Sequence, residues 1–152
     1  MNNANILLFL QETLSACIGT IAFALLFGVP RRYYPLCGMI GAVGWVLFRA
    51  AEPFAGRMMA VFLASAAVVL LSRLFAVRAG CPATIFMVPG LFPLVPGAGI
   101  YWTIYELVMK NMTEALSRGF VALQDAVAIV LGIVVIFELP QRVFARARKK
   151  II

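Results

Sequence analysis

The stretch VPGLFPLVPGAG, from Val88 to Gly99, concentrates helix-breaking residues inside a strongly apolar region. It holds three prolines and three glycines. Proline lacks a backbone N–H and clashes with the preceding helical turn, and glycine weakens a helix by about 1 kcal/mol relative to alanine. We predict an interrupted helix with a gap near Pro93–Gly97 and a second half that begins near Gly97. The alternative is a continuous helix with a proline kink.

The composition of the chain is that of an integral membrane protein. Of its 152 residues, 64% are hydrophobic and 12% are charged, whereas a soluble domain has about 45–50% apolar and about 25% charged residues. The formal net charge is +7, and the basic residues lie in short segments between apolar runs. We therefore predict an all-α membrane protein. Nucleic acid is excluded as a partner, because no basic face is interleaved with aromatic residues.

Five apolar segments are candidates for membrane-spanning helices, since one crossing needs about 20 residues. We expect these helices at about 4–29, 36–51, 58–77, 83–109 and 120–139, within a single membrane domain covering 1–152. Polar stretches should connect them, among them EPFAGR (Glu52–Arg57) and KNMTEALSRG (Lys110–Gly119), the longest loop.

The distribution of basic residues predicts how the helices cross the membrane. Cytoplasmic segments of membrane proteins carry an excess of Lys and Arg. With the C-terminus inside, nine basic residues lie on the inner side and four on the outer side, so we predict N-outside and C-inside. The inner set is Arg31, Arg32, Arg73, Arg78, Arg142, Arg146, Arg148, Lys149 and Lys150, and the outer set is Arg49, Arg57, Lys110 and Arg118.

An interruption near the middle of a membrane span suggests a binding site. Irregular backbone survives in hydrocarbon only where protein buries it or a polar cavity solvates it. The second half-helix would direct free N–H groups and its positive dipole end toward the gap, which suits a carboxylate, and secondary transporters use broken helices in this way. The expected substrate-binding residues are Pro93, Pro96, Gly97, Gly99 and Tyr101.

Three acidic residues lie within the apolar segments, namely Glu12, Glu106 and Asp125. A charge in the bilayer is costly, and such residues usually face a cavity, a partner or a proton path. We predict that all three lie in the outer half of the membrane and take part in proton coupling or line a polar cavity. The alternative is that neighbouring polar side chains satisfy them or that they reach the interface.

Small residues recur on two segments, as Gly38, Gly41 and Gly44 and again as Ala60, Ala64 and Ala67. They allow membrane helices to approach closely. We expect them to pack within the chain's own bundle, the alternative being an interface with another subunit.

Metal, cofactor and enzymatic chemistry find little support in the sequence. There is no histidine, and Cys17, Cys37 and Cys81 are isolated, so a zinc or haem site lacks its usual ligands. No nucleophile is paired with a base, and no phosphate-binding loop adjoins an aqueous face. We predict no metal, no cofactor and no enzymatic activity.

The segment PATIFMVPGLFPLVPGAGIYWTIYELV resembles the signature of the threonine/serine exporter family, in its short membrane half. The early Gln11-Glu12 pair and the run GMIGAVGW are also similar to that family. The positions that carry the main resemblance are Pro82, Ala83, Pro93, Leu94, Val95, Pro96, Gly97 and Tyr101.

The resemblance implies the small subunit of a split exporter in the cytoplasmic (inner) membrane of a bacterium. Such a subunit would work with a larger membrane subunit of the same family, or with further copies of itself. It would export small carboxylates, either threonine and serine or a dicarboxylate such as succinate, using the proton motive force. The alternatives are a scaffold subunit without substrate contact and a channel subunit.

Overall fold

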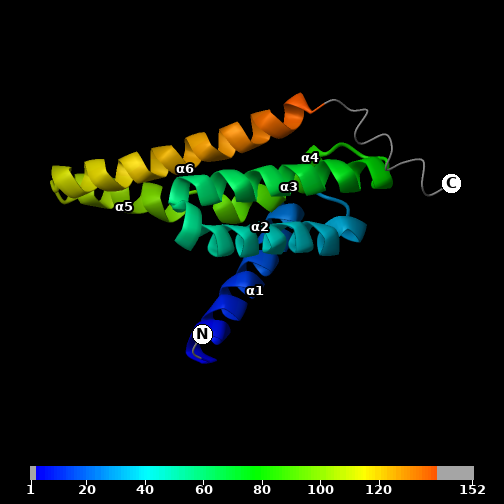
Figure 1. Cartoon of the computed structure of the whole chain (residues 1–152), viewed down its shortest axis with the longest axis horizontal. Coiled ribbons are helices and arrows are strands. Elements are labelled where there is room, and N and C mark those ends of the chain that lie inside the picture. Colours follow the sequence, from blue (N-terminus) through cyan, green and yellow to red (C-terminus); the bar gives the residue numbers. More distant parts are fainter. Residues whose placement is uncertain (1–2, 140–152) are drawn as a thin grey trace.

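A computed structural model describes residues 3–139 as a bundle of helices (Figure 1). Residues 31–94 also include two short 3-10 turns, η1 and η2, which adjoin α2 and α4. The elements are α1 (Asn3–Leu26), η1 (Arg31–Tyr33), α2 (Tyr34–Ala55), α3 (Arg57–Ala79), α4 (Thr84–Leu91), η2 (Phe92–Leu94), α5 (Gly97–Val108) and α6 (Met112–Glu138).

Four of these helices are long and apolar enough to cross a membrane, and the bent pair of α4–η2 with α5 is either a fifth, broken span or a re-entrant loop. The prediction of an all-α membrane protein with about five spans is therefore confirmed. The basic tail from Arg142 to Lys150, on which much of the predicted orientation depends, lies outside the described residues. The orientation and the single domain over 1–152 stay predictions.

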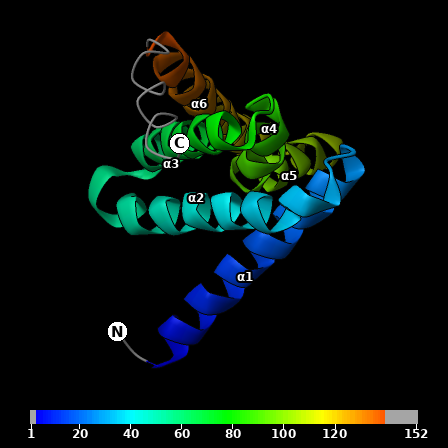
Figure 2. The same cartoon turned by 90° about the vertical axis from the view of Figure 1, so that its right-hand side faces the viewer.

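The core forms around α3, which contacts α2, α4 and α6 (Figure 2). Its buried side chains include Val61 and Val68, which pack with Ile40 of α2 and Phe86 of α4 in one apolar cluster. Helix α1 contacts α2, α4 and η2, and its N-terminal end leans away from the rest of the bundle (Figure 2). One side of α1 therefore has protein contacts along only part of its length.

Close helix approaches occur where glycines face neighbouring side chains. A Cβ on Gly41 would overlap Thr20 of α1, and one on Gly44 would lie 2.5 Å from Val68 of α3. Gly132 of α6 faces α3 at Ser65 in the same way. The small residues predicted on the second segment thus pack within this chain's own bundle, as expected from their role in membrane helices.

The fourth span is interrupted where the sequence predicts. Helix α4 ends at Leu91, η2 follows, Val95 is extended, and α5 begins at Gly97. The two parts are bent by 48°. They also differ in burial, because α4 buries Phe86, Pro89, Gly90 and Leu91, whereas α5 buries none of its residues against the described part of the chain.

Two of the expected polar connections are mostly helical, which corrects the sequence prediction. Helix α2 continues through Glu52 to Ala55 and tolerates Pro53 in its last turn, ending at Gly56 with a φ of 78°. Helix α6 begins at Met112 rather than near 120, after Lys110 has turned the chain with a φ of 61°. Polar residues such as Glu114 are good helix formers and favour the first turn, so a helix can extend beyond its apolar span.

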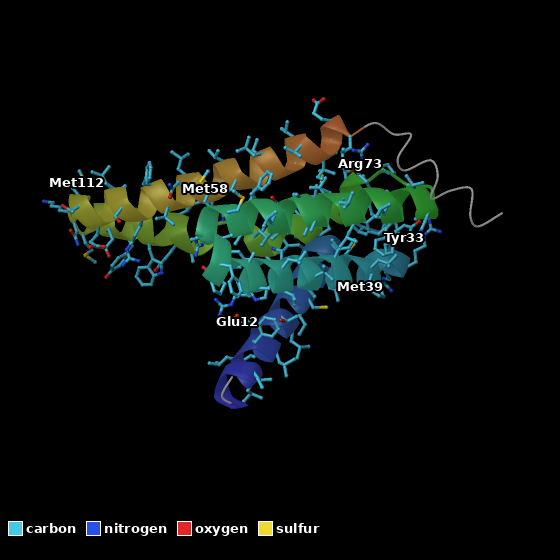
Figure 3. The ribbon with its side chains drawn as sticks, in the orientation of Figure 1. Glu12, Tyr33, Met39, Met58, Arg73 and Met112 are labelled. Atoms are coloured by element: carbon cyan, nitrogen blue, oxygen red, sulfur yellow. The ribbon has the colours of Figure 1, made fainter. Side chains whose placement is uncertain are left out.

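The other end of α6 is held by Arg73 of α3 (Figure 3). Its guanidinium donates hydrogen bonds to the carbonyl of Ile136 and, at 3.3 Å, to that of Leu139. The last carbonyls of a helix have no partner within the helix and form its negative end. Arg73 therefore caps α6 instead of facing open water.

Candidate functional site

A cavity of about 410 Å³ lies where α1 and α2 meet the helix interruption. Glu12 contributes a carboxylate from α1, Trp45 contributes an indole from α2, and Pro93 comes from η2. Figure 3 shows Glu12 on α1 beneath the end of α2. The full lining is Leu8, Gln11, Glu12, Ser15, Ala16, Trp45 and Pro93.

Local sequence and packing explain why these side chains meet. Leu8, Glu12 and Ser15 are spaced by four and three residues, so they share one face of α1. Trp45 follows Gly41 and Gly44, which let α2 approach its neighbours closely. Pro93 lies inside η2, where the chain has left the α-helical path. The cavity is thus built from one acidic helix face, one aromatic residue and the break.

Two residues that line this cavity each carry a buried polar atom without a hydrogen-bond partner among the described residues. The two atoms are Oε2 of Glu12, an acceptor, and Nε1 of Trp45, a donor. The guanidinium Nε of Arg49 does lie 3.0 Å from Oε2 of Glu12, but the pair attracts by charge without a directed hydrogen bond. A buried polar atom without a partner costs about 1–3 kcal/mol. Nε1 of Trp45 is such an atom, whereas Oε2 of Glu12 keeps the charge attraction of Arg49.

Glu12 is one end of a chain of charges that crosses the bundle. Arg49 lies 3.0 Å from both Glu12 and Glu52, and Arg57 lies 3.9 Å from Glu52. Arg57 then reaches Asp125 of α6, with 2.8 Å between Nη2 and Oδ2. The chain therefore connects α1, α2, α3 and α6 at the end of the bundle where α2 turns into α3.

Asp125 is fully satisfied by Arg57 and does not line the cavity. The residue is 1% exposed, and its two oxygens accept three hydrogen bonds from the guanidinium, at 2.8 to 3.2 Å. Two-point pairing of arginine with a carboxylate adds both energy and geometric specificity. The contacts give Asp125 a position between α3 and α6 and a fixed partner.

Glu106 lies apart from the other two acids, next to the turn between α5 and α6. One of its oxygens accepts a hydrogen bond from Asn111 at 3.2 Å, and the other lies 3.9 Å from Nε of Arg118. Figure 1 shows this turn projecting beyond the turn between α2 and α3. The structure thus places Glu12 and Asp125 in one charge network and Glu106 in another.

The predicted substrate-binding residues are not all brought together. Pro93 lines the cavity with Glu12, but Pro96 lines a separate apolar groove of about 500 Å³ between α5 and α6. Gly99 packs toward Ala122, 3.2 Å from where a Cβ would stand, whereas Gly97 has open space. Tyr101 is 61% exposed and meets the ring of Trp102 edge-on at 5.3 Å.

Sequence reasoning missed Trp45 and Arg49 as members of the site. Trp45 belongs to the GMIGAVGW run, which resembles the family but carries no predicted role. Arg49, which the charge distribution places in the predicted outer basic set, lies on α2 and pairs with Glu12. The spacing of Trp45 and Arg49 indicates that they belong together, because residues four apart on a helix share one face.

The four long apolar helices, the bent fifth pair and the polar cavity at its break define an all-helical multi-pass membrane protein with a candidate ligand site. The family model described as "Threonine/Serine exporter, ThrE" matches residues 12–138. The chain belongs to the threonine/serine exporter family, and the predicted resemblance is confirmed. No curated protein and no solved structure matches the chain.

Proposed function

We propose that this chain is the membrane subunit of a secondary exporter that binds a small carboxylate substrate in the Glu12 cavity. Threonine and serine are the first candidates, and a dicarboxylate such as succinate is the other. The exporter works with a larger membrane subunit of the same family, or with further copies of this chain. It uses the proton motive force and resides in the inner membrane of a bacterium.

The observation that supports this proposal is that Glu12 and Trp45 line one cavity. Oε2 of Glu12 has the charge of Arg49 beside it but accepts no hydrogen bond, and the buried Nε1 of Trp45 has no acceptor among the described residues. The ammonium of an amino acid suits the carboxylate of Glu12. Its carboxylate suits the N–H of Trp45. Small-molecule sites are mostly apolar with a few placed polar groups, and the Glu12 cavity has this composition.

The helix interruption adds a second favourable element for an anionic group. Helix α5 begins at Gly97 without a side-chain cap, directly after Pro96. Its first N–H groups carry the positive end of the helix dipole. Because η2 contributes Pro93 to the cavity and α5 starts four residues after it, at Gly97, that positive end lies close along the chain to the proposed site.

Efflux from proteoliposomes tests the proposal. Vesicles are loaded with labelled serine, threonine or succinate, and a proton gradient is imposed. This chain alone is compared with the chain co-purified with its larger subunit. We expect gradient-dependent efflux of serine and threonine from the complete assembly. No efflux from a folded, associated assembly would contradict the proposal and favour a scaffold role, whereas a large electrical current would favour a channel.

A further inference from the structure

The charge chain around Glu12 has an imbalance that bears on how transport is coupled. Three carboxylates, those of Glu12, Glu52 and Asp125, share two guanidiniums. Within these described ion pairs the cluster therefore carries one more negative than positive charge. Charges inside a membrane domain are costly unless paired, so the cluster favours one additional positive charge.

The geometry shows where that charge is missing. Asp125 accepts three hydrogen bonds from Arg57, and Glu52 accepts one from Arg49 at 3.0 Å. Glu12 shares Arg49 with Glu52 and keeps a buried oxygen without a hydrogen bond from the described residues. Its side chain is 38% exposed and lines the cavity. Of the three acids, Glu12 is therefore the one that combines a shared guanidinium with access to the cavity.

We propose that Glu12 holds one exchangeable positive charge, which is either a proton or the ammonium group of the substrate, and that the two compete for its carboxylate. This inference rests on the proposed function and adds its coupling step. When an amino acid binds to protonated Glu12, the O–H bond breaks, the proton leaves to water, and the carboxylate pairs with the substrate's –NH3⁺. No oxidant or other reactant is needed.

The groups facing Glu12 are few. On α1 it is the one charged residue, and Cys17 is the other titratable side chain. Helix α2 adds Arg49 and Glu52 at this end, with Tyr34 and Cys37 in its first turn at the opposite end. The two other elements packed against α1, which are α4 and η2, carry no titratable residue. A pH response of ligand binding in this cavity is therefore attributable to Glu12 as modulated by Arg49.

Competition makes a thermodynamic prediction. If binding of serine displaces a proton, protons must weaken serine binding by the same factor. The apparent Kd for serine then rises as the pH falls, approaching about tenfold per pH unit once Glu12 is mostly protonated. Glycerate, which carries a hydroxyl in place of the ammonium, should bind without releasing a proton.

The test measures proton release in weakly buffered solution when serine is added to the purified native assembly. We expect release of up to about one proton per bound serine, since one carboxylate is involved. Glu12→Gln should abolish the release and flatten the pH dependence of binding. The matched control is Glu114→Gln, an exposed acid of α6 outside the cavity, which should behave as wild type.

A second variant leaves Glu12 chemically intact. Glu52→Gln removes the competitor for Arg49, so the guanidinium should neutralise Glu12 more fully. The proton and the ammonium group of serine should then both bind Glu12 less tightly. Serine binding should weaken, and its pH dependence should move to lower pH. A purely structural role of Glu52 would not shift the pH profile.

The outcomes separate the two proposals. Proton-gradient-driven serine efflux without proton release on binding, or with release that persists in Glu12→Gln, overturns the competition and leaves the exporter function standing. The absence of serine binding and efflux from a folded assembly contradicts the exporter function, and the competition fails with it. Release that Glu12→Gln removes and Glu114→Gln retains supports both.

Discussion

Glu12 and Asp125 are both carboxylates within long apolar helices, and both belong to one chain of ion pairs, but their surroundings differ. Asp125 is enclosed between α3 and α6, and its oxygens accept three hydrogen bonds from Arg57. Glu12 lies in the less enclosed α1, shares its arginine with Glu52, and faces a cavity. Two acids that look equivalent in the sequence therefore differ in burial and in how completely they are paired.

The contrast between these two carboxylates distinguishes a structural charge from a functional one inside a membrane bundle. A fully paired acid has no hydrogen-bonding position left for a ligand. Removing its partner leaves an uncompensated charge. An incompletely paired acid in a cavity can exchange partners, which is what binding and coupling require. Asp125 fits the first description and Glu12 the second, and the following predictions test this contrast.

The largest effect on stability is expected for Asp125→Ala. The change leaves the guanidinium of Arg57 without its main partner at the junction of α3 and α6. Loss of one partner of a buried pair costs about 3–5 kcal/mol, and because the side chain of Arg57 is half exposed we expect the lower end, about 3 kcal/mol. Unfolding with a denaturing detergent in mixed micelles measures it. Recovery of stability in the double variant Arg57→Met with Asp125→Leu would confirm that the unpaired charge is the cause.

Gly132→Ala tests whether packing fixes the helix that carries Asp125. A Cβ there would overlap the Ser65 hydroxyl and lie 3.0 Å from two backbone atoms of α3. Overpacking of this kind costs about 1–3 kcal/mol, measured by the same unfolding assay. Gly19→Ala is the control, since nothing lies within 4 Å of its added Cβ, and it should be neutral or stabilising. Equal stability of the two variants would contradict the close contact of α3 and α6.

Glu12→Gln should lower the free energy of unfolding less than Asp125→Ala does. Its ion pair with Arg49 is partly exposed, and pairs of this kind contribute about 0–1 kcal/mol. We expect a free energy of unfolding within about 1 kcal/mol of wild type, together with loss of gradient-driven serine efflux. A destabilisation as large as that of Asp125→Ala would show that the two acids do not differ as argued.

Glu106→Gln should have the smallest effect. Glu106 lies 3.9 Å from Arg118 and bonds Asn111 next to the turn between α5 and α6, and its amide replacement retains an acceptor. We expect a stability loss of about 0.5 kcal/mol or less, because a pair at 3.9 Å contributes little, and efflux close to that of wild type. A complete loss of efflux would move the coupling role from Glu12 to this second cluster.

Much of the fold follows from local sequence chemistry. The interruption and the start of α5 at Gly97 were predictable because proline and glycine act on their own turn of backbone. The four long spans and the interrupted apolar segment were predictable because apolar length decides membrane crossing. The true ends of α2 and α6 were not, because a helix can continue beyond its apolar part with residues such as Glu114.

The candidate site was predictable only in part. Glu12 and Pro93 follow from the cost of a charge and of broken backbone in a membrane. Trp45 and Arg49 depend on how closely α2 approaches α1, which tertiary packing decides. The separation of Pro93 from Pro96 depends on the 48° bend, and no local rule gives the direction in which each proline then faces.

The most direct test of the account replaces the chain's two tryptophans one at a time with phenylalanine and measures equilibrium binding of labelled serine to the native assembly. Trp45→Phe removes the buried indole N–H that has no acceptor among the described residues, whereas Trp102→Phe changes a half-exposed ring on α5. A hydrogen bond to a charged group contributes about 1.5–3 kcal/mol. We predict that Trp45→Phe weakens binding at least about tenfold and that Trp102→Phe leaves it unchanged. Unchanged binding in Trp45→Phe, or a larger loss in Trp102→Phe, would contradict the placement of the substrate in the Glu12 cavity.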